Sequence, residues 1–122
     1  MKRILADHNI PGPLIRLLKA FEVKTAVECG WNTLKNGALL DALEKAGFDV
    51  LLTGDKNLPS EQNMASRRIG IVALSCNNWR IICHYVPAIA EGLHKCKPGQ
   101  VLPVFCGAFH PQQRKQQGPK PE

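Results

Sequence analysis

Short apolar runs alternate along the chain with segments in which apolar residues recur at the spacing of a helix face. Each run is rich in Val, Leu and Ile, which is typical of a short buried β-strand. The expected strands are residues 2–6, 23–27, 49–53, 69–74 and 101–105. Because strands and helices alternate, the pattern predicts an α/β domain of three layers, α/β/α, with a mostly parallel, five-stranded sheet in the middle.

The helical spacing occurs in three longer segments. These are residues 13–21, 36–46 and 79–95. Pro13 is tolerated in a first helical turn, and Gly47 supplies a stop after the second helix. Pro87 lies inside the third segment, where it either kinks the helix or divides it in two. The stretch 59–68 is expected to form a turn and a short helix capped by Ser60.

The C-terminal stretch 107–122 differs in composition from the rest of the chain, since it is polar and rich in Pro and Gln. It lacks the apolar surface needed to fold, so we expect a disordered basic tail there and a single domain over residues 1–106. No apolar segment reaches the roughly eighteen residues that span a bilayer, and the N-terminus lacks the apolar region of a signal peptide. We therefore expect a cytoplasmic protein that does not bind a membrane.

Charge and cysteine content narrow the class of protein only partly. Of the net charge of +6, the tail carries +2 from three basic residues and Glu122, which leaves +4 for residues 1–106. A basic body attracts a polyanion such as RNA, but an ordinary solvated surface has the same balance of charge. The five cysteines form no C-x-x-C pair, which argues against a disulfide framework or a zinc ribbon and favours reduced thiols.

Acidic and amide side chains follow the predicted strands. Asp7 comes directly after the first strand, and a single glycine separates Asp55 from the third. Because parallel strands end at one edge of a sheet, these two residues predict a shared acidic cleft. Glu28 follows the second strand and either joins this cleft or faces water. Asn77 and Asn78 come shortly after the fourth strand.

Several common α/β sites are excluded by their missing motifs. The first strand is not followed by G-x-G-x-x-G, and the chain has neither a P-loop nor a nucleophile elbow. A receiver domain would need adjacent acids after the first strand and a lysine after the last one, and this sequence provides neither.

Three groups of residues carry a resemblance to a known family. They are Leu5–Pro11 (LADHNIP), Gly30 with Asn36–Leu40 (NGALL), and Leu51–Leu58 (LLTGDKNL). In their order and separation they resemble the small stand-alone PIN-like proteins, an uncharacterised bacterial branch of the PIN nuclease superfamily. The resemblance is clearest over residues 1–75 and weaker beyond them.

The resemblance implies a PIN-like fold and a ribonuclease that depends on Mg²⁺ or Mn²⁺, often the toxin of a toxin–antitoxin pair. It further implies that Asp7 is the first metal-binding acid of the site and Asp55 a later one, so these two are the expected catalytic residues. RNA and an antitoxin protein are the corresponding partners. A homodimer is the oligomeric state considered, and the sequence leaves it open.

The chain departs from the family where further acids are expected. Asn36 stands at the start of the second helix, as a metal-binding amide or a plain helix cap, and Asn77 follows the fourth strand. A Mg²⁺ site typically uses one or two carboxylates, so Asp7 and Asp55 can hold one ion with help from amide oxygens, and a two-metal mechanism is not expected. The expected substrate-binding residues are Asn9, Lys56 and Asn77, although Lys56 is equally suited to a surface salt bridge.

Two functions of different classes follow. In the first, one hydrated cation between Asp7 and Asp55 lowers the pKa of its bound water and neutralises charge on a scissile phosphate, so the protein is an endoribonuclease. In the second, the loss of acids has removed catalysis, and the domain binds a protein partner or nucleic acid through its basic surface.

Overall fold

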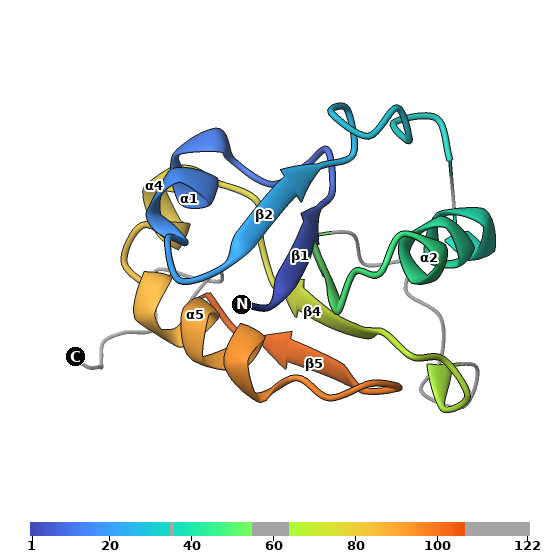
Figure 1. Ribbon diagram of the computed structural model, residues 1–122. Coiled ribbons are helices and arrows are strands. Elements are labelled where there is room, and N and C mark those ends of the chain that lie inside the picture. The colour runs from blue at the N-terminus through green and yellow to red at the C-terminus, as the bar shows by residue number, and fades with distance from the viewer. Residues whose placement is uncertain (35, 55–63, 107–122) are drawn as a thin grey trace.

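The computed structural model describes residues 1–34, 36–54 and 64–106, with only the backbone at Asn36 (Figure 1). Strands and helices alternate along this part of the chain. In order they are β1 (Arg3–Ala6), α1 (Gly12–Leu17), β2 (Glu22–Thr25), α2 (Asn36–Lys45), β3 (Val50–Thr53), β4 (Gly70–Leu74), α4 (Trp79–Ile82), α5 (Val86–Lys95) and β5 (Val101–Val104).

The five strands form one sheet in the order β2-β1-β3-β4-β5, and every neighbouring pair is parallel. The predicted α/β class and the five-stranded sheet are therefore confirmed, and the sheet is parallel throughout rather than mostly parallel. β3 and β4 are buried along their whole length, as expected for inner strands covered on both faces. The expected positions of strands 1, 3, 4 and 5 agree with the structure to within one residue at each end.

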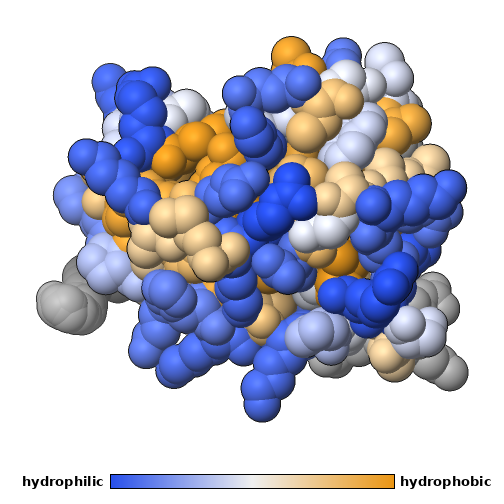
Figure 2. Space-filling view, in the orientation of Figure 1, coloured by the Kyte–Doolittle hydropathy of each residue, from blue (hydrophilic) through white to orange (hydrophobic). Residues whose placement is uncertain are grey.

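Two apolar clusters lie on opposite faces of the sheet. Ile4 and Ala6 of β1 belong to the cluster that α1, α4 and α5 cover, whereas Leu5 belongs to the cluster under α2. Side chains alternate between the faces of a strand, so each inner strand supplies both clusters. Figure 1 shows the resulting layers, with α1, α4 and α5 gathered on one side of the sheet and α2 on the other. On the face shown in Figure 2, hydrophilic residues surround smaller hydrophobic patches.

The first helix is shorter than its apolar spacing predicts. α1 ends at Leu17, and Leu18 has left the helical conformation with φ −89° and ψ 57°. Leu18 and Phe21 are nevertheless buried in the cluster under α1, and the Phe21 amide donates to the Leu18 carbonyl at 3.2 Å. A turn therefore places these two side chains in the core and directs the chain into β2.

The second strand ends earlier than predicted, at Thr25 rather than at position 27. Val27 is 64% exposed and lies in the turn that follows. Thr25 and Glu28 close this turn reciprocally, because the Thr25 amide donates to Glu28 Oε1 at 2.8 Å and the Glu28 amide donates to Thr25 Oγ1 at 3.1 Å. This local pairing ends the strand before the apolar residue is reached.

The segment predicted as one helix from 79 to 95 is two helices. α4 ends at Ile82, and α5 starts at Val86 with Pro87 in its first turn, so of the two expected outcomes the division is the one observed. The first half of the expected short helix at 59–68 lies outside the described residues, as does the whole predicted tail. Within the described ranges, no helix has both the length and the apolar character needed to cross a membrane.

The cysteines are free thiols, as predicted. Cys96 and Cys106 are buried, and burial raises the pKa of both thiols. They therefore remain protonated at neutral pH and pack as small apolar residues.

Lys2 caps the C-terminal end of α5. Its Nζ donates to the carbonyl oxygens of Leu93, His94 and Cys96 at 2.8, 2.9 and 2.8 Å. The carbonyls at a helix C-terminus lack partners within the helix and carry partial negative charge, so a cation satisfies both requirements. The N-terminus is thereby attached to an element more than ninety residues away in the sequence.

Replacing Lys2 with methionine is therefore expected to destabilise the protein by about 1–2 kcal/mol, because charge-assisted hydrogen bonds are lost while the apolar stem is kept. Lys19→Met is the matched control, since Lys19 is exposed and no contact of its ammonium is found in the described part of the chain. Urea denaturation of both variants measures the difference. Equal stability of the two variants would show that the cap contributes nothing.

Candidate functional site

The strand order places a topological switch point between β1 and β3. From β1 the chain moves outward to β2 at one edge, and from β3 it moves in the opposite direction to β4. The two connections separate at the carboxyl ends of β1 and β3, which is where open parallel sheets form their binding crevices. Asp7 follows β1 directly and Gly54 follows β3 directly.

The Asp7 carboxylate is fixed at this point by both neighbouring segments. Its Oδ2 accepts a hydrogen bond from Thr53 Oγ1 at 3.0 Å, and its Oδ1 accepts from the His8 amide at 2.8 Å. The side chain is 14% exposed, and the Asp7 amide donates to the Leu52 carbonyl of β3 at 3.0 Å. Two carboxylate oxygens offer about four acceptor positions, so this group can still bind a cation.

The His8 ring extends the same contact toward solvent. Its Nδ1 lies 3.0 Å from Asp7 Oδ1, a hydrogen bond when Nδ1 carries the proton. The ring is 68% exposed. His8 thus places an exposed imidazole beside the acidic residue.

Two amide side chains lie beside the end of β3. Asn9 Oδ1 accepts from the Gly54 amide at 3.1 Å. A methyl group added at Gly54 would lie 3.5 Å from Asn77 Cβ and 3.7 Å from Asn9 Cγ, so both side chains pass close to this glycine. The structure therefore brings Asp7, Asn9 and Asn77 to the same edge of the sheet.

The structure gives less information about the other predicted site residues. Asp55 and Lys56 lie outside the described residues. Asn36 begins α2, as expected for its position in the sequence. Arg3 begins β1, and its Nη1 donates to the carbonyl of Ala46, which directly follows α2. The C-terminal end of α2 therefore lies near the amino end of β1, and Asn36 is at the other end of the helix. Asn78 is a helix cap, since its Oδ1 accepts from the Arg80 amide at 3.0 Å.

Glu28 is held in the turn after β2. The Thr25 amide is the main cause that lowers the pKa of the Glu28 carboxyl, with smaller contributions from the Thr25 hydroxyl and Lys24. The carboxylate is exposed and lines a pocket whose wall includes neither Asp7 nor Asn77. Of the two alternatives left open by the sequence, the structure favours a solvent-facing Glu28.

The Asp7 carboxylate and the amide oxygens near the end of β3 are donors of the kind that a hard cation prefers. Over residues 1–34, 37–54 and 64–106, no group of three or more His, Cys, Asp or Glu side chains is close enough to hold a metal ion. One carboxylate with amide oxygens and waters matches the ligands of Mg²⁺, which keeps several waters when it binds proteins. Thr53 and His8 are the two site residues that the sequence did not single out.

Comparison of the chain with protein-family models, with curated proteins and with solved structures finds no match.

Proposed function

We propose that this protein is a metal-dependent endoribonuclease of the PIN-like type, in which Asp7 and Asp55 hold one Mg²⁺ or Mn²⁺ ion. The observation that supports this proposal is the position of Asp7, whose carboxylate is fixed by Thr53 at the switch point of a parallel sheet. Gly54, bonded to Asn9 at the same place, immediately precedes Asp55 in the sequence. The sequence resemblance supplies the reaction class.

Each residue of this edge has a part in the proposed reaction. A bound divalent ion would supply a water of lowered pKa and positive charge for the phosphate. Asp7 contributes the fixed negative charge that binds and orients the ion, and Thr53 holds that carboxylate in place. Asn77 is exposed and can donate its amide hydrogens to a phosphate oxygen. Contact with a phosphate oxygen is also proposed for the Asn9 amide and the Lys56 ammonium. Asn36 is proposed as a further amide ligand.

His8 suits the proton transfer of the same reaction. Hydrolysis of a phosphodiester leaves an oxygen that must gain a proton, and histidine is the side chain that most often serves as a general acid. The 3.0 Å contact with Asp7 keeps the ring at the site. In a toxin–antitoxin pair, which remains part of this proposal, an antitoxin protein would control access to this edge.

A second function is supported by a different observation. In the described part of the chain, the amides Asn9 and Asn77 lie beside Gly54, next to the Thr53 that binds Asp7, and no group of three or more acidic, histidine or cysteine side chains is placed to hold a metal ion. A domain that has exchanged acids for amides keeps its ability to hydrogen-bond a phosphate or a partner and loses charge that would hold a cation. The alternative is thus a PIN-like module that binds nucleic acid or a protein partner without cleaving RNA.

Metal binding is tested without RNA by thermal unfolding. Mn²⁺ at about one hundred times its dissociation constant should stabilise the protein by about 2.7 kcal/mol, a rise of Tm on the order of 10 °C. The double variant Asp7→Asn with Asp55→Asn should lose this rise, because the charge that holds the ion is gone. Asp41→Asn should keep it, since Asp41 is exposed on α2 and pairs with Arg67 at 2.9 Å. An undiminished rise in the double variant would remove both residues from the metal site.

A further inference from the structure

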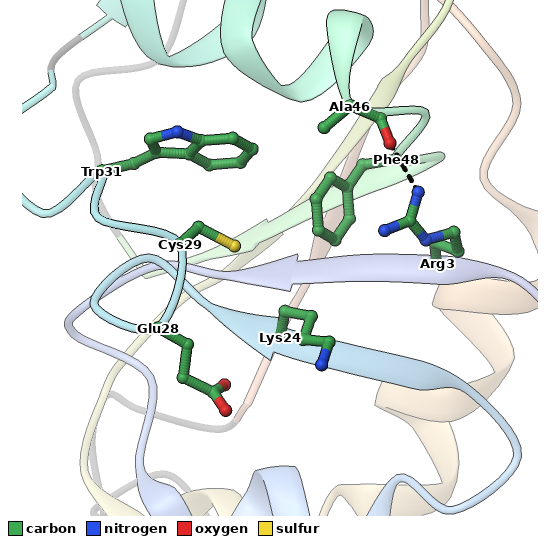
Figure 3. Close-up of a pocket in the computed structure, with 7 residues that line it drawn as sticks. All are labelled: Arg3, Lys24, Glu28, Cys29, Trp31, Ala46 and Phe48. Carbon is green, nitrogen blue, oxygen red and sulfur yellow. Dashed lines mark hydrogen bonds between the residues drawn. The ribbon is translucent and has the colours of Figure 1, made fainter.

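A pocket of about 570 Å³ lies beside β2, on the face of the sheet that α2 covers (Figure 3). This volume is within the range of roughly 300–1,000 Å³ found for small-ligand sites. Its lining residues come from β1, β2, the turn and loop after β2, and the segment that follows α2. They are Arg3, Lys24, Glu28, Cys29, Trp31, Ala46 and Phe48.

The pocket exists because α2 does not extend over the edge strand. Leu39, Leu40 and Leu43 of α2 pack in a cluster with residues of β1, β3 and β4. β2 contributes none of its own residues to this cluster. Lys24 is the register partner of Leu5, so it points to the same face and takes the place of an apolar residue there.

One wall of the pocket is aromatic. Trp31 is half-buried and contacts Phe48 edge to face, with the ring centroids 5.8 Å apart and an interplanar angle of 73°. The guanidinium of Arg3 lies 4.5 Å from the centroid of the Phe48 ring, and its Nε is 3.2 Å from Glu22 Oε2. Arg3 and Phe48 therefore form a fixed base, and Trp31 presents an aromatic surface at the side.

Opposite charges lie at separate points of the rim. The Lys24 side chain extends from β2 in Figure 3, and its ammonium has no hydrogen bond or ion pair with any described residue. The Glu28 carboxylate is fixed by Thr25 on the turn that follows. A ligand that fits has a flat ring for Trp31, an anionic group for Lys24 and a hydrogen-bond donor for Glu28.

We propose that this pocket binds one nucleotide of a single-stranded RNA, with the base against Trp31, a phosphate at Lys24 and an exocyclic amino group of the base at Glu28. A nucleotide carries all three groups, and stacking with a nearby cation is the usual basis of single-strand binding. That the ligand is RNA rests on the proposed function. The fit of the pocket to a nucleotide does not depend on that function. The pocket would hold the strand at a second point, beside β2, while the edge of the sheet at Asp7 cuts it.

The test uses tryptophan fluorescence in the presence of EDTA, so that binding is measured without cleavage. In a Trp79→Phe background Trp31 is the single remaining tryptophan. Titration with an adenosine octaribonucleotide should quench its fluorescence.

Lys24→Gln should weaken binding by about fivefold and reduce the slope of log affinity against log salt by about one. Lys19→Gln, which makes the same change at an exposed site following α1, should bind as the parent does.

A second variant tests the aromatic contact. Trp31→Leu, followed by fluorescence anisotropy of a labelled octamer, should weaken binding by at least about fivefold. Because Lys24 is exposed, Lys24→Gln remains informative even if Trp31→Leu unfolds. Parental affinity in Lys24→Gln would overturn the assignment, and equal affinity for AMP and the octamer would contradict binding as part of a strand.

The outcomes separate this inference from the proposed function. Lys24-dependent binding by a protein that cuts no RNA would remove the nuclease and leave the nucleotide pocket. RNA cleavage by a protein whose affinity is unaffected by Lys24→Gln would support the nuclease and remove the pocket.

Discussion

Replacing Gly70 with alanine is expected to lower the free energy of unfolding by about 3 kcal/mol or more. Gly70 begins β4, inside the sheet, and a methyl group there would lie 2.5 Å from Cys96 Sγ and 2.6 Å from the Lys97 carbonyl oxygen. A thiol can rotate away, but the carbonyl belongs to the backbone of the turn between α5 and β5. That turn is attached to the sheet, since the Gly99 amide donates to the Ile69 carbonyl at 2.8 Å.

Gly37→Ala is the matched control for this substitution. Gly37 lies in α2, and a methyl group there would meet no atom within 4 Å. Alanine is the better helix former by up to about 1 kcal/mol, so this variant should be equal to or more stable than the parent. Chemical denaturation of the two variants gives the comparison. Parental stability in Gly70→Ala would show that the turn after α5 does not pack against β4 as described.

The parts of the fold that could be predicted are those in which a local pattern decides the structure. Val50–Thr53 is a short, mostly apolar run between Asp49 and Gly54, and it is a strand buried along its whole length. Gly47 follows α2 with φ at +81°, a conformation that glycine adopts most readily, and the helix stops there as expected. In both cases the neighbouring residues contain the physical cause.

The errors arise where another contact, local or tertiary, competes with the apolar spacing. Leu18 and Phe21 have helical spacing, and both are buried, but a turn rather than a continued helix places them in the core. Val27 extends an apolar run, yet the pairing of Thr25 with Glu28 ends β2 first and leaves Val27 exposed. Periodicity alone does not distinguish these alternatives, since it reports which residues are buried and not how the backbone brings them there.

The candidate site was predicted in part for a general reason. Any parallel sheet brings its strand ends to one edge, so Asp7, Asn9 and Asn77 could be grouped without knowledge of the strand order. The role of Thr53 in holding Asp7 could not be predicted, because its hydroxyl reaches Asp7 only when β3 is next to β1. The pocket beside β2 was missed for a related reason, since it depends on which strand α2 leaves uncovered.

Asp7→Asn is expected to abolish RNA cleavage while the protein remains folded. Asparagine has the shape of aspartate and still offers a hydrogen-bonding partner to the Thr53 hydroxyl and to the His8 amide. It lacks the negative charge proposed to hold the cation. Loss of groups that only support a metal ligand commonly costs 10- to 100-fold, so loss of the ligand itself should reduce cleavage by at least about a hundredfold.

The most direct measurement is cleavage of labelled single-stranded and structured RNAs by the parent protein, Asp7→Asn and Asp41→Asn, with Mn²⁺, with Mg²⁺ and with EDTA. Circular dichroism of each protein establishes that it is folded. The proposed function predicts cutting by the parent and by Asp41→Asn in either metal, none in EDTA, and none by Asp7→Asn. Equal cutting by Asp7→Asn, or no cutting by the folded parent protein in either metal, would contradict it.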